Sequence, residues 1–166
     1  MKKNEVIGFF GGKFLPFHKG HLFCVKVAAS MCDKVYVILF DSPCNRKLEH
    51  GTNIDDLLTV SAREKQIKEA VAHYKNVEYR FINTDECLDK NGDEDWDKET
   101  PLVINAIGSN FKYVFSSEPS YGDYFKRAYP WAEHVIVDEK RVIVPISGTK
   151  VRSMTRKEAE VWIANS

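Results

Sequence analysis

The chain contains five apolar runs of about strand length, and helical patterns separate them. The runs are continuous rather than alternating, which is typical of strands buried on both faces of a parallel sheet. Because strand and helix alternate, we expect an α/β fold: an open, doubly wound parallel sheet with helices on both faces. The expected strands are Val6–Phe10, Val35–Phe40, Val77–Ile82, Tyr113–Phe115 and His134–Val137.

The helical patterns lie between these runs and after the last one. Ser61–Tyr74 opens with Ser61 and carries Glu64 three residues later, which predicts a capping box at the start of that helix. The other expected helices are Leu22–Met31, Pro101–Ile107, Tyr121–Ala128 and Arg156–Ala164.

Length, charge and cysteine usage narrow the class of protein. The 166 residues predict one domain that spans 1–166. The formal net charge is zero, so no basic excess favours nucleic acid or an acidic membrane surface. We expect no signal peptide and no transmembrane span, and we expect a cytoplasmic protein. Its reduced thiols would be Cys24, Cys32, Cys44 and Cys87, which form no CxxC pair.

Two long polar loops follow predicted strands. Residues 41–60 form the first, and Thr84–Glu99 forms the second, which is rich in acidic residues and holds a lone Trp96. In open parallel sheets, ligands bind beyond the carboxyl ends of the strands, and both loops would lie at that edge. We interpret the acidic residues mainly as a solvated surface, because the glycine at position 92 is misplaced for an EF-hand loop.

The stretch GGKFLPFHKGH, from Gly11 to His21, lies where the first strand turns into a helix. A helix N-terminus favours phosphate through its free N–H groups and its positive potential. His18 and His21 could donate hydrogen bonds to a phosphate oxygen that gains charge in a transition state. Two alternatives stay open: the histidines cap and pack the helix, or they bind zinc together with Cys24.

The segment from Pro145 to Arg152 predicts a second helix start. Pro145 ends an apolar run, and Ser147 and Thr149 are natural N-cap residues. Gly148 permits a close approach of the backbone, and Arg152 would extend from the first helical turn. A capped helix with a solvated basic face is the alternative, but with the first motif this segment predicts a second phosphate site.

The two segments resemble the (H/T)xGH and ISxTxxR motifs of the nucleotidylyltransferase superfamily. Three further features resemble nicotinamide-nucleotide adenylyltransferases, in particular the adenylyltransferase domain of the bacterial bifunctional NAD-biosynthesis regulator. They are Lys13 in the G-K-F-x-P lead-in, the SSEP segment Ser116–Pro119, and the NG…W loop that ends at Trp96. The resemblance covers Val6 to about Thr155 and leaves no room for the regulator's DNA-binding and kinase domains.

The resemblance implies a Rossmann-like sheet of about five strands in the order 3-2-1-4-5. It also implies that NMN attacks the α-phosphate of ATP in line to give NAD⁺ and pyrophosphate, a reaction that depends on positioning and charge stabilisation. Magnesium would bridge the triphosphate through phosphate oxygens and waters, with no metal ligand from the protein.

The resemblance assigns roles residue by residue. His21 would stabilise the α-phosphate, Arg152 would hold the leaving pyrophosphate with Ser147 and Thr149, and Trp96 would stack on nicotinamide unless it serves packing. The implied catalytic residues are His18, His21, Lys13 and Arg152. The implied ATP contacts are Gly11, Gly12, Lys13, Phe14, His18, His21, Ser116, Ser117, Ile146, Ser147, Thr149 and Arg152; the implied NMN contacts are Lys13, Phe14, Arg63, Trp96 and Glu118.

Other functions compete with this one. A pantetheine-phosphate adenylyltransferase or a cytidylyltransferase would use the same two motifs, although Lys13 and the SSEP segment favour NMN. A nucleotide sensor without catalysis would keep the binding residues only. The expected partners are ATP and NMN, with no nucleic acid and no membrane; the sequence leaves open whether the chain forms a homo-oligomer.

Overall fold

A parallel five-stranded sheet forms the centre of the molecule. The computed structural model describes residues 4–42 and 50–164. The strand order is β3-β2-β1-β4-β5 and every pair is parallel, which confirms the predicted sheet. The strands are β1 (Ile7–Gly12), β2 (Lys34–Asp41), β3 (Val77–Asn83), β4 (Tyr113–Ser116) and β5 (Glu133–Ile136).

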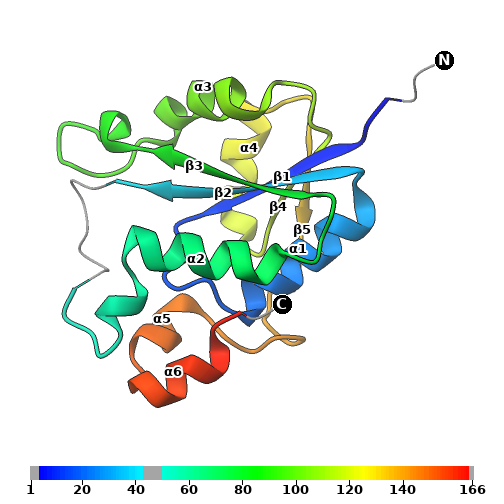
Figure 1. The fold of residues 1–166 in the computed structure, drawn as a ribbon. Coiled ribbons are helices and arrows are strands. Elements are labelled where there is room, and N and C mark those ends of the chain that lie inside the picture. The colour runs from blue at the N-terminus through cyan, green and yellow to red at the C-terminus, as the bar shows by residue number, and fades with distance from the viewer. Residues whose placement is uncertain (1–3, 43–49, 165–166) are drawn as a thin grey trace.

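Helices cover both faces of this sheet, and a smaller pair lies beside one face (Figure 1). α1 (Lys19–Met31) and α2 (Val60–Val71) cover one face, and α3 (Trp96–Ile107) and α4 (Gly122–Ala128) cover the other. The pair is α5 (Gly148–Arg152) and α6 (Arg156–Trp162). Three short 3-10 helices complete the described elements: η2 (Asp55–Leu57), η3 (Asp85–Cys87) and η4 (Pro119–Tyr121).

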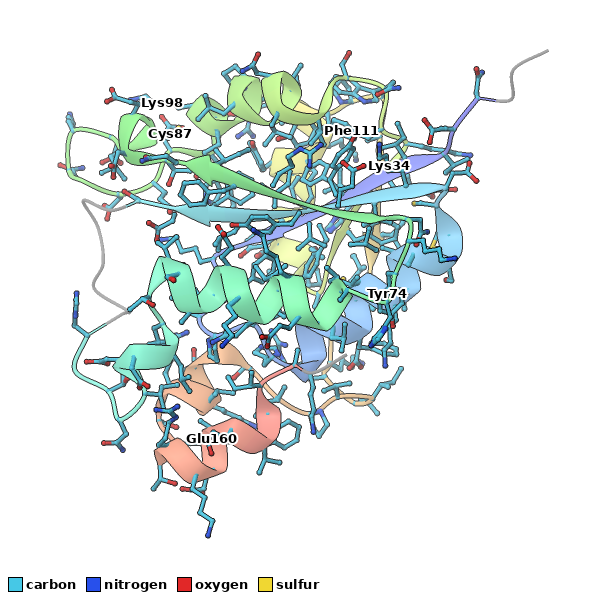
Figure 2. All side chains as sticks on the ribbon, in the orientation of Figure 1. Lys34, Tyr74, Cys87, Lys98, Phe111 and Glu160 are labelled. Atoms are coloured by element: carbon cyan, nitrogen blue, oxygen red, sulfur yellow. The ribbon has the colours of Figure 1, made fainter. Side chains whose placement is uncertain are left out.

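The apolar runs are continuous because the sheet has a core on each side. In β2, Val35 and Val37 belong to the cluster under α1 and α2, whereas Tyr36 and Ile38 belong to the cluster under α3 and α4. Phe111, labelled in Figure 2, is 1% exposed and packs in this second cluster. Successive side chains point to opposite faces, so a strand buried on both faces has no polar positions to alternate with.

Four predicted helix starts differ from the structure. α1 begins at Lys19 instead of Leu22, and α4 begins at Gly122 instead of Tyr121. α2 begins at Val60, and its N-cap is Thr59, whose side chain accepts from the Ala62 N–H; Ser61, predicted to cap this helix, lies inside it. α3 begins at Trp96, five residues before the predicted start at Pro101. Asp95 caps α3, and the exposed Pro101 inside the helix costs a backbone hydrogen bond without breaking it.

The C-terminal helix pair packs against the loop that follows β1. Leu15 from that loop shares a small apolar cluster with Ile146, Val151 and Ala159. The Ala164 N–H donates to the Phe17 carbonyl at 3.1 Å. The end of the described chain thereby fixes the segment that leads into α1.

Three of the four cysteines lie in the described residues and are free and buried: Cys24, Cys32 and Cys87. Burial raises the pKa of the Cys32 thiol to about 11 and raises that of Cys24 further. Cys87, labelled in Figure 2, ends η3 just beyond β3. Cys44 lies outside the described residues. Within the described part of the chain, every helix is too short or too polar to cross a bilayer.

Candidate active site

The first motif forms a turn between β1 and α1 at the carboxyl edge of the sheet. Phe14 has a φ of 53°, in the left-handed region that most residues avoid, and it is held there by burial at 3% exposure. Gly20 is the residue that leaves room for the helix cap, because a Cβ there would lie 2.9 Å from His18 Cε1. Local strain and tight packing of this kind are typical of a functional turn.

His18 and His21 form a reciprocal capping box at the start of α1. His18 Nδ1 accepts from the Gly20 N–H at 3.1 Å and from the His21 N–H at 3.4 Å. His21 Nδ1 in turn accepts from the His18 N–H at 3.1 Å. Since Nδ1 is an acceptor in both rings, the proton of each neutral imidazole resides on Nε2. His18 therefore caps the helix, as the alternative prediction had it, and His21 retains an Nε2–H donor.

Both imidazoles are neutral at physiological pH. Burial, and then the positive charges of Arg141 and Arg152, lower the pKa of His18 to about 4. Burial, followed by His18 and Arg141, holds the pKa of His21 well below its usual value. The rings stack with centroids 3.6 Å apart, and two positively charged imidazoles at this distance would repel each other. His21 can thus donate a hydrogen bond without first taking up a proton.

The second motif meets the first through Arg152. Ser147 caps α5, as predicted, by accepting from the Lys150 N–H at 3.2 Å. Arg152 Nη1 donates to the Leu15 carbonyl at 2.8 Å, and Nη2 donates to Thr149 Oγ1 at 3.3 Å. A Cβ on Gly148 would lie 3.0 Å from Arg152 Nη1 and 3.2 Å from the Leu15 oxygen, so glycine permits this junction. Two segments distant in the sequence thereby form one site.

A cavity of about 370 Å³ opens at this junction, within the size range of small-molecule sites. Nine of the predicted site residues line it, and they come from the first motif, the second motif and the start of α3. They are Gly11, Gly12, Lys13, Phe14, His21, Trp96, Ser147, Thr149 and Arg152.

The other predicted site residues are not part of this lining. His18 is 1% exposed and acts as the cap of α1, and Ile146 is 2% exposed and packs in the cluster with Leu15. Ser116 is buried, with its hydroxyl on the imidazole of His134 and on the Glu118 N–H. Ser117 and Glu118 follow β4, and the exposed Glu118 carboxylate accepts from the Ser120 N–H.

Arg63, predicted to help place substrate, is buried behind the cavity. Its guanidinium donates to the Lys13 carbonyl at 2.9 Å and lies 2.8 Å from Asp41 Oδ1. Its Nε donates to the Leu58 carbonyl at 2.8 Å. At 1% exposure, Arg63 fixes the backbone that carries Lys13 instead of reaching into the cavity itself.

Arg141 lines the cavity beside Arg152, and the sequence analysis missed it. Its φ of 52° is left-handed, and its Nη1 donates to the Ile146 carbonyl at 2.9 Å. Asp138 holds this loop by accepting from three consecutive backbone N–H groups, those of Val142, Ile143 and Val144, which lower its pKa. A lone arginine in a loop after a strand carries no recognisable pattern, so only the fold reveals it.

The opposite wall of the cavity is aromatic and acidic. Trp96 packs edge-on against Tyr121 with ring centroids 4.8 Å apart, and Tyr124 lies 5.6 Å from the same ring. Glu94 and Glu99 also line this wall, and Glu94 Oε1 lies 2.8 Å from Lys13 Nζ. The predicted solvated acidic surface is therefore wrong for Glu99, which is 7% exposed.

The missed start of α3 explains why Trp96 was predicted for this wall but Glu99 was not. With the helix predicted to begin at Pro101, Trp96 and Glu99 lay in a loop, and nothing predicted that their side chains point the same way. With the helix starting at Trp96, they are three residues apart and lie on one helical face. The signal was present in Asp95, a natural N-cap before an acidic first turn.

A model of the cytidylyltransferase-like family matches residues 9–154. The chain belongs to this family. The match includes both motifs and nearly all of the sheet, so the predicted superfamily resemblance is confirmed.

Relatives of known name fall into two groups. The chain is 26% identical over 158 residues to the trifunctional NAD biosynthesis/regulator protein NadR of Escherichia coli, a match that covers 91% of this chain and 37% of NadR. The chain therefore spans about a third of the length of that relative. It is also 38% identical over 129 residues to the phosphopantetheine adenylyltransferase of Mycoplasma capricolum, covering 78% of this chain and 81% of that protein.

Solved structures show the same fold. NadR in complex with NAD and AMP-PNP superposes with a TM-score of 0.69 at 22% identity, over 97% of this chain and 45% of that one. A bifunctional NMN adenylyltransferase/ADP ribose pyrophosphatase from Francisella tularensis gives a TM-score of 0.57 at 19% identity, over 81% of this chain and 38% of that one.

The donor set of the site favours phosphate over a metal ion. Lys13, Arg141 and Arg152 line one wall of the cavity with the neutral His21. Among the residues that the structure describes, no group of three or more His, Cys, Asp or Glu side chains is arranged to hold a metal. The wall can offset several negative charges at once, as a polyphosphate requires.

Proposed function

We propose that this protein is an NMN adenylyltransferase that joins NMN and ATP to form NAD⁺ and pyrophosphate. The observation that carries the proposal is the junction of the two motifs in one cavity, with His21 and Arg152 on one wall and Trp96 on the other. A cationic wall suits the triphosphate, and an aromatic, acidic wall suits the positively charged nicotinamide ring.

His21 stabilises the reacting phosphate in this proposal. Its Nδ1 is occupied by the His18 N–H, so its Nε2–H is the group that faces an oxygen of the α-phosphate. As the NMN phosphate attacks, that oxygen gains charge and the hydrogen bond strengthens. His18 acts through His21, because its side chain caps α1 and stacks on the His21 ring.

The two arginines hold the leaving pyrophosphate. Arg152 is tied to the Leu15 carbonyl and Arg141 to the Ile146 carbonyl, so both guanidinium groups are positioned before substrate binds. Ser147 and Thr149 add polar groups at the start of α5. Lys13, paired with Glu94 in this structure, would exchange that carboxylate for a phosphate oxygen.

Magnesium enters as part of the substrate, Mg-ATP. The cavity wall near the arginines is basic, so the ion would be held by phosphate oxygens and waters and would offset the triphosphate charge. No step in the proposed reaction asks the chain to supply a metal ligand.

Phosphopantetheine adenylyltransferase is the second candidate, because the relative from Mycoplasma capricolum is 38% identical and is matched over 81% of its length. Phosphopantetheine has no ring and no positive charge. The wall formed by Trp96, Tyr121 and Glu99 has no role with such an acceptor, which is why NMN is preferred here.

Parallel assays test the proposal. The protein is incubated with Mg-ATP and, separately, with NMN, phosphopantetheine and FMN, and pyrophosphate release is measured together with the dinucleotide product. We expect NAD⁺ formation with NMN and little pyrophosphate with the other two acceptors. Turnover of phosphopantetheine without turnover of NMN would overturn the substrate assignment, and pyrophosphate release from none of them would favour a nucleotide sensor.

A further inference from the structure

We infer that Glu99 is a specificity-determining residue that selects a pyridine acceptor bearing an uncharged carboxamide over the same ring bearing a carboxylate. This inference rests on the proposed function and names the feature of the acceptor that the aromatic wall of the cavity recognises.

Glu99 is a buried carboxyl group without a partner. Its side chain lines the cavity from α3, yet the residue is only 7% exposed. Within the described part of the chain, its Oε1 has no hydrogen-bond partner. A buried polar atom in this state is costly, and at the wall of a cavity a ligand can supply the missing partner. When the carboxyl group is ionised, the partner that Oε1 requires is a hydrogen-bond donor.

Glu94 Oε1 likewise makes no hydrogen bond within the described residues, but unlike Glu99 it belongs to an ion pair. Its Oε1 lies 2.8 Å from Lys13 Nζ, so its charge is already offset by a cation of the protein. Glu99 has no such cation at hydrogen-bond distance among the described side chains. Of the two carboxyl groups on this wall, Glu99 is therefore the one left to engage a ligand.

The position of Glu99 on α3 fits a substituent of a stacked ring. Trp96 and Glu99 are three residues apart on one helix and share a face. Tyr121 packs edge-on against Trp96, which leaves the indole a defined surface for a flat ligand. A carboxamide on such a ring has an NH₂ group that donates to Oε1, whereas a carboxylate has only acceptors.

The charges around Glu99 disfavour a second anion. Burial, followed by the negative charge of Glu94, raises its pKa to about 8, and Lys13 acts in the opposite direction. Below that pH, a protonated Glu99 can share its proton with a ligand carboxylate. Above it, two carboxylates would face each other, while an amide NH₂ still finds an acceptor. Selection for the amide should therefore increase as pH rises through about 8.

The other titratable groups that interact with Glu99 keep their protonation state near pH 8. Burial raises the pKa of both Tyr121 and Tyr124 above the ordinary value for tyrosine, so neither ionises near pH 8. Burial raises the pKa of the Cys87 thiol as well. Within the described residues, the titratable groups that interact electrostatically with Glu99 include Lys13, Cys87, Glu94, Asp95, Tyr121, Tyr124 and Tyr129.

The test compares kcat/KM for NMN and for its carboxylic acid form at about pH 6.5 and about pH 9. The ratio of the two values cancels every titration that affects both acceptors alike, including those of the phosphates and the histidines. For the wild type we expect the ratio to rise by about tenfold, the effect of one pKa unit. Glu99→Gln should give a ratio that does not change with pH.

Glu69→Gln is the matched control, since Glu69 lies on α2 with its side chain 64% exposed. It should reproduce the wild-type ratio at both pH values. If Glu99 had only a structural role, Glu99→Gln would lower activity with both acceptors equally. The ratio for the variant would then equal the wild-type ratio at each pH. The pH dependence of the ratio is measured on the wild type alone. It therefore still tests the inference if the Glu99→Gln protein fails to fold.

The outcomes separate the inference from the proposed function. If either pyridine acceptor is turned over but the wild-type ratio is flat with pH, the role of Glu99 is overturned and the adenylyltransferase proposal stands. The same holds if Glu99→Gln keeps the wild-type slope. If neither acceptor is turned over, the proposed function fails, and the inference fails with it.

Discussion

The two walls of the cavity are built in different ways. The cationic wall comes from two stretches of chain, the turn after β1 and the segment from Arg141 to the start of α5, and it holds His21 and Arg152 through backbone hydrogen bonds. The aromatic and acidic wall is assembled from single side chains of different elements, such as Trp96 on α3 and Tyr121 on η4.

This difference separates what a family shares from what it varies. A triphosphate has the same shape in every reaction of this type, so the groups that hold it can be fixed by local backbone geometry. Acceptors differ, and side chains that reach the cavity from separate elements can change one at a time. The relatives named above, NadR and phosphopantetheine adenylyltransferase, match 91% and 78% of the chain, and their names point to different acceptors.

The largest expected effect is at the residue that supports Lys13 from behind. Arg63→Met should lower the free energy of unfolding by about 3–5 kcal/mol, because Asp41 would lose the buried guanidinium that lies 2.8 Å from it. Urea unfolding followed by circular dichroism measures this loss. Arg127→Met, which removes an exposed partner of Asp97, is the control and should change stability by about 0.5 kcal/mol or less. Equal losses in the two variants would contradict a structural role for Arg63.

The second largest effect is expected from a substitution that changes only the cationic wall. His21→Ala should lower kcat by about a hundredfold or more, because an Nε2–H donor to the reacting phosphate is lost. Steady-state kinetics with saturating NMN and Mg-ATP measure it, and the melting temperature should stay near that of the wild type. His73→Ala, at an exposed histidine after α2, should behave as the wild type. A near-normal kcat would remove His21 from the mechanism.

A smaller effect is expected on the opposite wall. Trp96→Ala should raise the KM for NMN by about tenfold, since ring stacking and cation–π attraction contribute about 1–2 kcal/mol. The KM for ATP should change little. Trp131→Ala, at another partly exposed tryptophan, is the control and should leave both constants unchanged. If the KM values for NMN and ATP rise together in Trp96→Ala, the two walls do not act separately.

The smallest effect concerns the stability of the free protein. Glu99 has its pKa raised to about 8, above its unfolded value, so its contribution is fully present below that unfolded value and is lost as pH rises toward 8. Glu99→Gln carries no charge and should be more stable than the wild type at pH 9 by about 1 kcal/mol or more. The two should differ little at pH 5. A difference that does not depend on pH would argue against a buried, titrating Glu99.

The fold and the cationic wall could be predicted from the sequence because their signals are local. Apolar runs define β1 to β5, and Ser147 sits at the cap position expected for α5. Arg141 was missed because its position in the cavity depends on a loop that Asp138 holds by hydrogen bonds. No spacing in the sequence predicts that loop. Glu99 was missed because one error of five residues, at the start of α3, removed it from the helix face that it shares with Trp96.

The hydrogen bond from Arg152 to the Leu15 carbonyl joins residues 137 positions apart. During synthesis, the turn after β1 leaves the ribosome long before its partner exists. The cavity between the two motifs is therefore incomplete until the last part of the domain has been made. Activity should begin late in translation, in one step, when α5 reaches the finished sheet. Shorter products of interrupted synthesis would then be unable to consume nucleotide.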